Sequence, residues 1–179
     1  MSGVNPQERL SPSEAEKWFL AGFIEGEGSY CASIKSQPSS RFGLFVDPEF
    51  FLYQHEHGRA LLERAQRMFG TGRISRKVGN EAVLVFSINA RRSLKERVIP
   101  FLLEYVYPFS AKQDQILVFA EIVDLLERKV HFSPEGLIGI VEKAYAMNPG
   151  SKGKERKQTL QAIRERILRG HTPDIQTPG

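Results

Sequence analysis

Cysteine is almost missing from this chain of 179 residues, which contains only Cys31. A single thiol excludes an internal disulfide bond and a cysteine-rich zinc site, and it favours a reducing, intracellular setting. No apolar run approaches the roughly 18 residues that a membrane-spanning helix needs, so we expect no membrane partner. Residues 1–10 lack the basic flank and apolar core of a signal peptide, so we do not expect a secreted protein.

Positive charge exceeds negative charge only slightly, with 25 Lys and Arg against 21 Asp and Glu. The excess is concentrated in residues 148–170, which contain seven cationic and two anionic residues. Such a local excess is typical of a surface that binds a polyanion, because neutralised phosphates release their condensed counterions. Composition leaves an alternative open, in which this segment is a solvated helix face.

The pattern of apolar residues predicts an α+β fold: an αββαββα unit with a four-stranded antiparallel sheet, helices on one face of that sheet and additional C-terminal helices. We expect a flexible arm at 1–10, a single domain at 11–170 and a disordered tail at 171–179. The first helix is expected to begin at Ser11, with Pro12 at its first position and Glu14 three residues after the cap. The predicted strands are 29–35, 41–54, 72–77 and 83–89, and the predicted later helices are 58–69, 91–103, 110–128, 133–147 and 157–169.

The end of the first helix, with the sequence LAGFIEGEG at residues 20–28, is the most unusual segment. Gly22 and Gly26 lie one helical turn apart and allow another backbone to approach closely. Nothing else in the chain repeats the pattern, so we expect the partner to be the same helix of a second copy. Two copies of Glu27 would then lie close together, and a divalent cation such as Mg²⁺ would relieve their repulsion. The alternative is a glycine-rich helix end with solvated glutamates.

These nine residues closely resemble the signature of the LAGLIDADG homing endonucleases, and Trp18-Phe19 and Ser29-Tyr30 on either side also fit that family. The order of helices and strands over about residues 12–130 resembles the single-motif type. The resemblance implies a homodimer that cuts double-stranded DNA at a long near-palindromic site, leaves short 3′ overhangs and serves intron mobility. It places six motif residues at the dimer interface: Leu20, Ala21, Gly22, Ile24, Glu25 and Gly26.

The resemblance also implies three catalytic residues. Glu27 would hold the divalent metal, Mg²⁺ or Mn²⁺, at the scissile phosphates, while Gln54 and Lys112 would position water and phosphate. The motif departs from the commoner pattern because Glu25 and Glu27 replace aspartates, and the extra methylene bears on the metal geometry. Taken without the family, Gln54 at a strand end and Lys112 in a first helical turn could equally be solvated side chains.

By the same resemblance, the sheet face opposite the helices lies on DNA and reads bases in the major groove. Lysines donate to guanine, glutamine pairs with adenine, and carboxylates accept from cytosine. The candidates for base contacts are Cys31, Ser33, Lys35 and Gln37 on the first strand, Asp47, Glu49, Phe51 and Tyr53 on the second, and Arg73, Ser75 and Lys77 on the third. The candidates for backbone contacts are Arg59, Ser151, Lys152 and Lys154.

Other interpretations of these residues are also considered. Phe45, Phe51 and Tyr53 would also suit a sheet that is covered on both faces. His55 and His57 have the spacing of two zinc ligands on a strand, but no third ligand is suitably placed, so we expect a solvated turn. Some members of this family bind nucleic acid without cutting it, as intron maturases or regulators, and an unrelated dimerisation protein would also explain the paired glycines.

Overall fold

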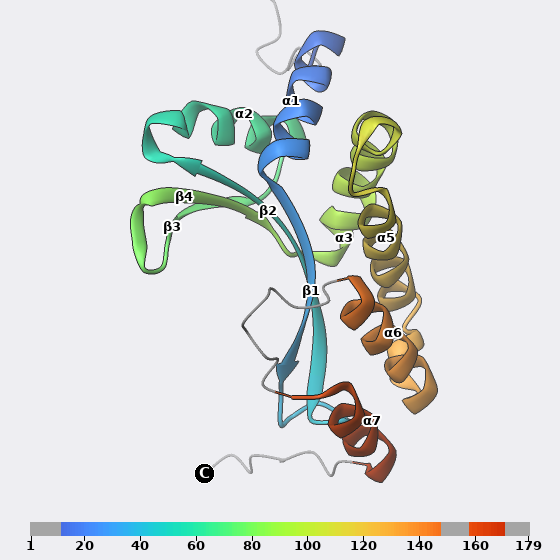
Figure 1. Cartoon of the computed structure of the whole chain (residues 1–179). Coiled ribbons are helices and arrows are strands. Elements are labelled where there is room, and N and C mark those ends of the chain that lie inside the picture. Colours follow the sequence, from blue (N-terminus) through green and yellow to red (C-terminus); the bar gives the residue numbers. More distant parts are fainter. Residues whose placement is uncertain (1–11, 148–157, 171–179) are drawn as a thin grey trace, which may run out of the picture.

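The computed structural model describes residues 12–147 and 158–170 (Figure 1). The first part of the chain runs through α1 (Glu14–Glu27), β1 (Gly28–Ser36), β2 (Leu44–His55), α2 (Arg59–Phe69), β3 (Arg73–Lys77) and β4 (Asn80–Ile88). A helical stretch from Arg91 to Phe109 follows. It contains α3 (Arg91–Ser93) and α4 (Ile99–Phe101), which are joined and extended by wider π-helical turns, and it ends with a 3₁₀ turn at Tyr107–Phe109. The last helices are α5 (Gln113–Glu127), α6 (Pro134–Met147) and α7 (Leu160–Arg169). The predicted arm at 1–10 and tail at 171–179 lie outside the described residues.

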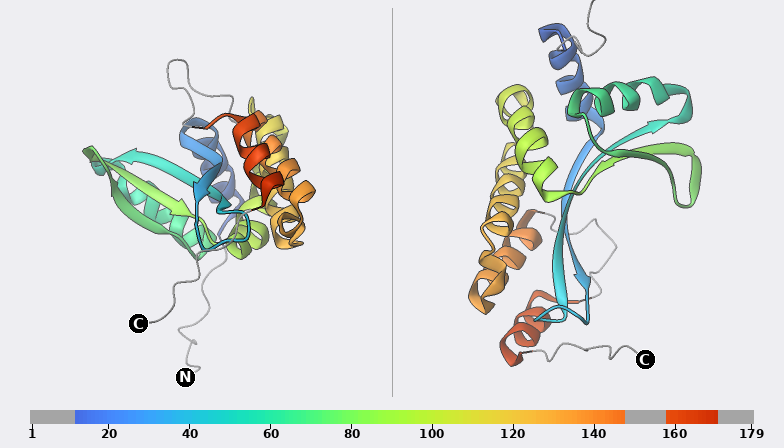
Figure 2. Two further views of the ribbon diagram at one scale, coloured as in Figure 1. Left: turned by 90° about the horizontal axis from the view of Figure 1, so that it is seen from below. Right: turned by 180° about the vertical axis from the view of Figure 1, so that it is seen from behind.

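The four strands form one antiparallel sheet in the order β1-β2-β4-β3, which confirms the predicted α+β class. Figures 1 and 2 show α5 and α6 along one side of the long β1–β2 ribbon, with α2 over the part of the sheet that β2 and β4 share. Within residues 12–147 and 158–170, no helix is both long and apolar enough to cross a lipid bilayer.

The first helix begins two residues later than predicted. Ser13 is the N-cap: its Oγ accepts from the backbone N–H of Glu16, and the Glu16 carboxylate accepts from the backbone N–H of Ser13. This reciprocal capping box satisfies two backbone donors that would otherwise lack partners. Glu14, the predicted partner of a Ser11 cap, instead accepts from Lys17 and Tyr105.

The alternation predicted along the second strand is confirmed, because Leu44, Val46, Phe50 and Leu52 are all buried. β4 pairs with β2 only from Phe50 to His55, so the first half of β2 has a neighbour on one side only. Pro48 lies in that half, where its missing N–H removes no ladder hydrogen bond on the open side. Pro48 therefore lies on a stretch of β2 that is an edge of the sheet.

An aromatic cluster joins the sheet to its helices. Phe50 is fully buried, and its ring centroid lies 5.7 Å from that of Phe69 in α2 and 6.5 Å from that of Phe86 in β4. Tyr30 in β1 stacks on Phe50 and also meets Phe119 of α5, with centroids 6.2 and 5.9 Å away. The cluster therefore joins the strands β1, β2 and β4 to the helices α2 and α5 in one core.

Tyr30 carries the one polar group in this cluster. It is 3% exposed, and its hydroxyl has no hydrogen-bond partner among the described residues. Burial raises the pKa of Tyr30 to about 12, and the negative charge of Glu25 adds to the rise. The neutral phenol is therefore the form that the folded state prefers.

We expect Tyr30→Phe to leave the free energy of unfolding unchanged at pH 7, or to raise it by up to ~1 kcal/mol, because no hydrogen bond is lost. The phenol ionises first in the unfolded chain, so its contribution to stability is complete below about pH 10. Between about pH 10 and 12 the wild type should lose roughly 2–3 kcal/mol that the variant keeps. Denaturant unfolding of both proteins over this pH range is the measurement. An equal loss of stability with pH in both proteins would contradict the raised pKa of Tyr30.

Candidate functional site

The site predicted from the motif lies at the junction between α1 and β1. Glu27 is the last residue of α1, and Gly28 starts β1 directly in an extended conformation. A Cβ atom on Gly28 would lie 2.3 Å from the carbonyl oxygen of Ile24, so only glycine allows this abrupt change from helix to strand. Glu27 is exposed and forms no hydrogen bond or ion pair with any described residue.

The other acid of the motif is bound within its own chain. The carboxylate of Glu25 accepts from the hydroxyl of Ser110 at 2.6 Å and from the backbone N–H of Ala111 at 3.1 Å. These bonds tie the last turn of α1 to the segment that precedes α5. The two motif glutamates therefore have different surroundings, and only Glu27 is available to a ligand.

Lys112 lies beside the same junction. Its Nζ donates to the carbonyl oxygen of Glu25 at 2.9 Å and to that of Gly28 at 3.2 Å. These carbonyls belong to the C-terminal end of α1, where the helix dipole favours a cation. The ammonium group therefore bridges backbone carbonyls that precede and follow Glu27 in the sequence.

Gln54 lies near the end of β2, two residues beyond Leu52, which pairs with Gly28. Its Oε1 accepts from the backbone N–H of His55 at 2.8 Å. Gly58 makes room for this side chain, because a Cβ there would lie 2.4 Å from Cγ of Gln54. The sheet register therefore brings Gln54 to the same end of the sheet as Glu27 and Lys112.

The structure corrects three of the six residues assigned to a dimer interface. Leu20, Ala21 and Ile24 are at most 5% exposed within one chain, so they pack in their own core and present no surface to a second copy. The opposite side of α1 is open: a Cβ atom on Gly22 or Gly26 would meet nothing within 4 Å. The motif is apolar on both sides of the helix, so the sequence alone does not show which side faces a partner.

An aromatic group flanks this open side, and its residues were not among those predicted to form a site. Trp18 and Phe19 are about half exposed, and Trp18 packs edge-on against Tyr105 and Phe109 with centroids 5.0 and 5.8 Å away. The two aromatic residues before the motif were the available signal. Their partners come from a helical stretch some ninety residues later, which no local pattern could indicate.

The sheet face away from the core collects the predicted base-contacting residues, and we call it the open face. The register places Cys31 opposite Glu49, Ser33 opposite Asp47, and Lys35 opposite Phe45. Further along, Phe51 and Tyr53 share this face with Arg73 and Ser75 through the β4 ladder, and Lys77 lies 5.3 Å over the ring of Tyr53. Gln37 lies beyond the end of β1, in the turn to β2.

The open face has additional members that the sequence argument did not name. Ser29, Val85 and Ser87 share it through the same register. The alternation of buried Leu84, Phe86 and Ile88 was the signal for the two residues of β4. Phe45, Phe51 and Tyr53 stay partly exposed, so the described residues provide no second layer on this side.

The remaining candidates are at the periphery or outside the described residues. Arg59 is exposed at the start of α2, and its Nε donates to Glu63 at 2.8 Å. Ser151, Lys152 and Lys154 lie outside the described ranges. His55 and His57 contact each other, but the described part of the chain contains no cluster of three His, Cys, Asp or Glu side chains placed to hold a metal.

Comparison with known proteins identifies the family. The family model described as LAGLIDADG endonuclease matches residues 20–123, and the chain belongs to this family. The chain is 41% identical over 133 residues to DNA endonuclease I-CeuI of Chlamydomonas moewusii, covering 73% of this chain and 61% of that protein. It is 30% identical over 147 residues to homing endonuclease I-ApeII of Aeropyrum pernix, covering 81% of this chain and 86% of that protein.

Solved structures agree with this family. The group I intron-encoded homing endonuclease I-CeuI, complexed with DNA, superposes with a TM-score of 0.82 at 35% identity, over 93% of this chain and 79% of that one. By sequence, the chain spans about three fifths of the length of I-CeuI. The predicted family and the antiparallel sheet with its helices are therefore confirmed.

The different surroundings of the two motif acids lead to a stability prediction. We expect Glu25→Ala to lower the free energy of unfolding by roughly 1–3 kcal/mol, because the Ser110 hydroxyl and the Ala111 N–H lose their acceptor. Glu27→Ala makes the same replacement two positions further along and should change the free energy of unfolding by less than about 0.5 kcal/mol. Denaturant unfolding at pH 7 compares the two, and equal losses would show that Glu27 also supports the fold.

Proposed function

We propose that this protein is a homodimeric homing endonuclease that cuts double-stranded DNA at a long, near-palindromic site and needs a divalent metal ion. The observation that carries this proposal is the carboxylate of Glu27, which pairs with no described residue and lies at the end of α1 next to the Lys112 contacts, at the same end of the sheet as Gln54. The open face of the sheet and the family to which the chain belongs support the same function. The relatives named above are DNA endonucleases.

The proposed dimer is supported by the two open glycines of α1. A glycine inside a helix costs about 1 kcal/mol relative to alanine. Nothing in the described chain requires this cost at Gly22 or Gly26, since an added Cβ would meet no atom within 4 Å. Close approach of a second α1 across a two-fold axis requires it, and such a pair would bring two copies of Glu27 together.

Glu27 fits the role of a ligand for Mg²⁺ or Mn²⁺. Hard divalent cations prefer carboxylate, carbonyl and phosphate oxygens, and Glu27 is an exposed carboxylate without a described partner. A single described chain lacks a three-residue metal cluster, which agrees with a site completed by a second copy and by DNA phosphates. When bound, the cation would stabilise negative charge on the oxygens of the scissile phosphate.

Lys112 and Gln54 have donors to spare for the phosphate and the water. An ammonium group has three N–H donors, and the carbonyls of Glu25 and Gly28 use two of them. The third is available to a phosphate oxygen, where it offsets the charge that develops during cleavage. The Gln54 carbonyl is occupied by the backbone of His55, so its amide N–H groups are left to orient a water molecule.

The open face would lie in the major groove and supply the sequence specificity. A two-stranded antiparallel ribbon fits this groove, and its alternate side chains reach the base edges. The basic segment 148–170, only part of which is described, would contribute contacts to the DNA backbone without reading sequence. The intracellular location expected from the near absence of cysteine, whether nucleoid, cytoplasm or organelle matrix, agrees with a DNA target.

A second candidate function is a non-cleaving relative, an intron maturase or regulator. The replacement of both motif aspartates by glutamates is the observation that favours it, because a ligand longer by one methylene changes the position of the metal. The retained Lys112 and the free Glu27 favour cleavage. The two functions differ in a single readout, which is whether bound DNA is cut.

The decisive experiment incubates the full chain with a randomised DNA library and Mg²⁺ or Mn²⁺ and sequences the cut ends. We expect both strands to be cut at one recurring site. Glu27→Gln should lower the cleavage rate by a factor of at least ~100. Replacing a hydrogen-bond partner of a metal ligand already lowers activity by up to about that factor, and Glu27 would be a ligand itself. DNA affinity in Ca²⁺ should remain, and tight binding by the wild type with no cutting under either metal would favour the maturase or regulator.

A substitution in α1 tests the dimer. We expect Gly22→Leu to leave the isolated chain folded, since the position is open, and to convert the dimer into a monomer with loss of double-strand cleavage. Gly139→Leu is the matched control, because Gly139 in α6 is also an open helical glycine. Sedimentation or light scattering gives the mass of each variant, and a dimeric Gly22→Leu protein would contradict this interface.

A further inference from the structure

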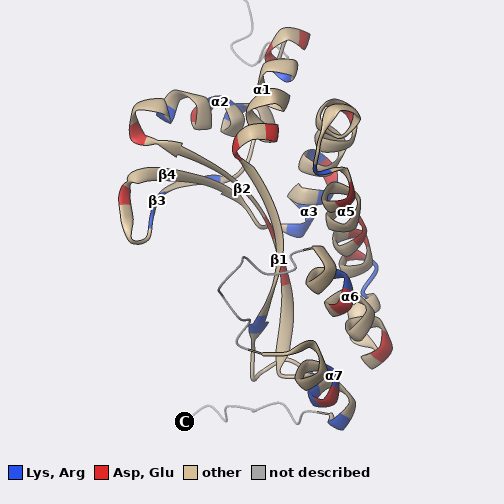
Figure 3. Ribbon diagram, in the orientation of Figure 1, with Lys and Arg blue, Asp and Glu red and all other residues tan. Residues whose placement is uncertain are grey.

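Lys35, Asp47 and Glu49 form a cluster of charges across β1 and β2 on the open face. Figure 3 shows both basic and acidic positions along the β1–β2 ribbon. Lys35 lies opposite Phe45, so its side chain reaches diagonally to Asp47, a distance that long side chains can span. Its Nζ donates to Oδ2 of Asp47 and lies 3.5 Å from Oε2 of Glu49. The hydrogen bond to Asp47 is the main cause that raises the pKa of Lys35, so the ammonium stays charged.

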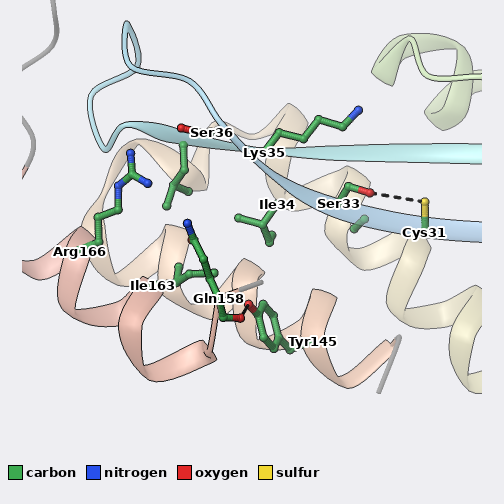
Figure 4. A pocket seen from close by; sticks show the side chains of 11 residues that line it. Cys31, Ser33, Ile34, Lys35, Ser36, Tyr145, Gln158, Ile163 and Arg166 are labelled. Atoms are coloured by element: carbon green, nitrogen blue, oxygen red, sulfur yellow. Dashed lines mark hydrogen bonds between the residues drawn. The ribbon is translucent and has the colours of Figure 1, made fainter. Parts of the chain in front are cut away.

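The cluster points outward from the fold. Figure 4 shows Ile34 directed toward Ile163 beside α7, while the side chain of Lys35, which also lines this cavity of about 480 Å³, extends away from Ile163. The residues that precede Lys35 on the same face of β1 are the small Cys31 and Ser33. The Lys35 side chain is 44% exposed, and that of Asp47, which lies beneath its ammonium group, is 19% exposed.

Stability is a weak reason for this cluster. The ion pairs are only partly buried, with Lys35 44% exposed and Asp47 and Glu49 19% and 17% exposed, so their contribution to stability is modest. Two carboxylates on a face that meets DNA would also repel its phosphates. Pairing with Lys35 removes much of that repulsion while leaving carboxylate oxygens free to accept further hydrogen bonds. A carboxylate held in this way can approach a base edge, which is where a hydrogen-bond acceptor is useful.

The arrangement matches one base pair. In the major groove a G·C pair presents two adjacent acceptors, N7 and O6 of guanine, followed by one donor, N4 of cytosine. An ammonium with several N–H donors complements the two acceptors, and the carboxylate bonded to it complements the donor. A T·A pair presents a methyl group in place of the first acceptor, guanine N7, and places adenine N7 beyond the donor that faces the carboxylate, so it fits less well.

We propose that Lys35 and Asp47 act as one unit that reads a single G·C base pair, with guanine under Lys35 and cytosine under Asp47. The unit rests on the proposed function, because it needs the open face to lie in the major groove. In the proposed homodimer the two-fold axis repeats the unit, so the target carries the same G·C requirement once in each half.

The test uses the full chain and compares base preferences at every position of the cut sites selected from a randomised library. We expect the wild type to require G·C at one position per half-site. Lys35→Met and Asp47→Asn should each relax that same position, by a factor of roughly 5 to 150, the range for a good paired base contact. Relaxation at two different positions would show that the residues read separately and would overturn the unit.

A charge reversal gives the stronger result. Lys35→Glu with Asp47→Lys keeps the ion pair and the net charge but exchanges donor and acceptor, so the preferred pair should change from G·C to C·G. The matched control is Lys143→Glu with Glu121→Lys, which reverses a 2.9 Å ion pair between α6 and α5 and should leave all preferences unchanged. A reversed variant that folds and still prefers G·C would contradict the inference. If reversal prevents folding, the two single variants decide.

The outcomes separate this inference from the proposed function. A wild type that binds DNA but never cuts it would refute the proposed cleavage. The same comparison then applies to sequences selected by binding in Ca²⁺, and loss of the G·C preference in both single variants would still support the unit. A wild type that cuts specifically without any G·C position altered by these variants would leave the nuclease intact and refute the unit.

Discussion

The end of α1 is tied to the segment just before α5 by two charged side chains, one from each side. Glu25 reaches out from the helix to Ser110 and Ala111, and Lys112 reaches back to the helix carbonyls. These opposite contacts fix where the helix stops and thus where Glu27 stands. Because α5 also packs against β1, the same segment connects the motif helix, the sheet and the outer helices.

The sheet is built so that one face serves the core and the other remains free. The core face carries the aromatic cluster around Phe50, and the open face carries charged, small and aromatic side chains in register. The register depends on period-two alternation, so a slip by one residue would exchange the two faces completely. Packing of the buried aromatic residues therefore also sets Cys31 opposite Glu49 and places Lys35 diagonally from Asp47.

Most of the fold was predictable from local patterns. The strands, the hairpin order and the later helices followed from alternation, glycine turns and helical periodicity. The helix start was misplaced because two serines and two glutamates offer overlapping caps, and only the contact of Glu14 with Lys17 and Tyr105 decides between them. Helix boundaries of this kind depend on side chains that are distant in sequence, so local propensity cannot determine them.

The sequence by itself determined the family, the sheet and the identity of the candidate acid, because a nine-residue motif and a strand alternation are local features. Only the tertiary structure decided which motif residues are free. It buried Leu20, Ala21 and Ile24, bound Glu25 to Ser110, and left Gly22, Gly26 and Glu27 open. A helix has a full circle of faces, and which of them is covered depends on what the rest of the chain packs against it. That partner surface comes from residues about 85 positions away, so no reading of the motif alone could supply it.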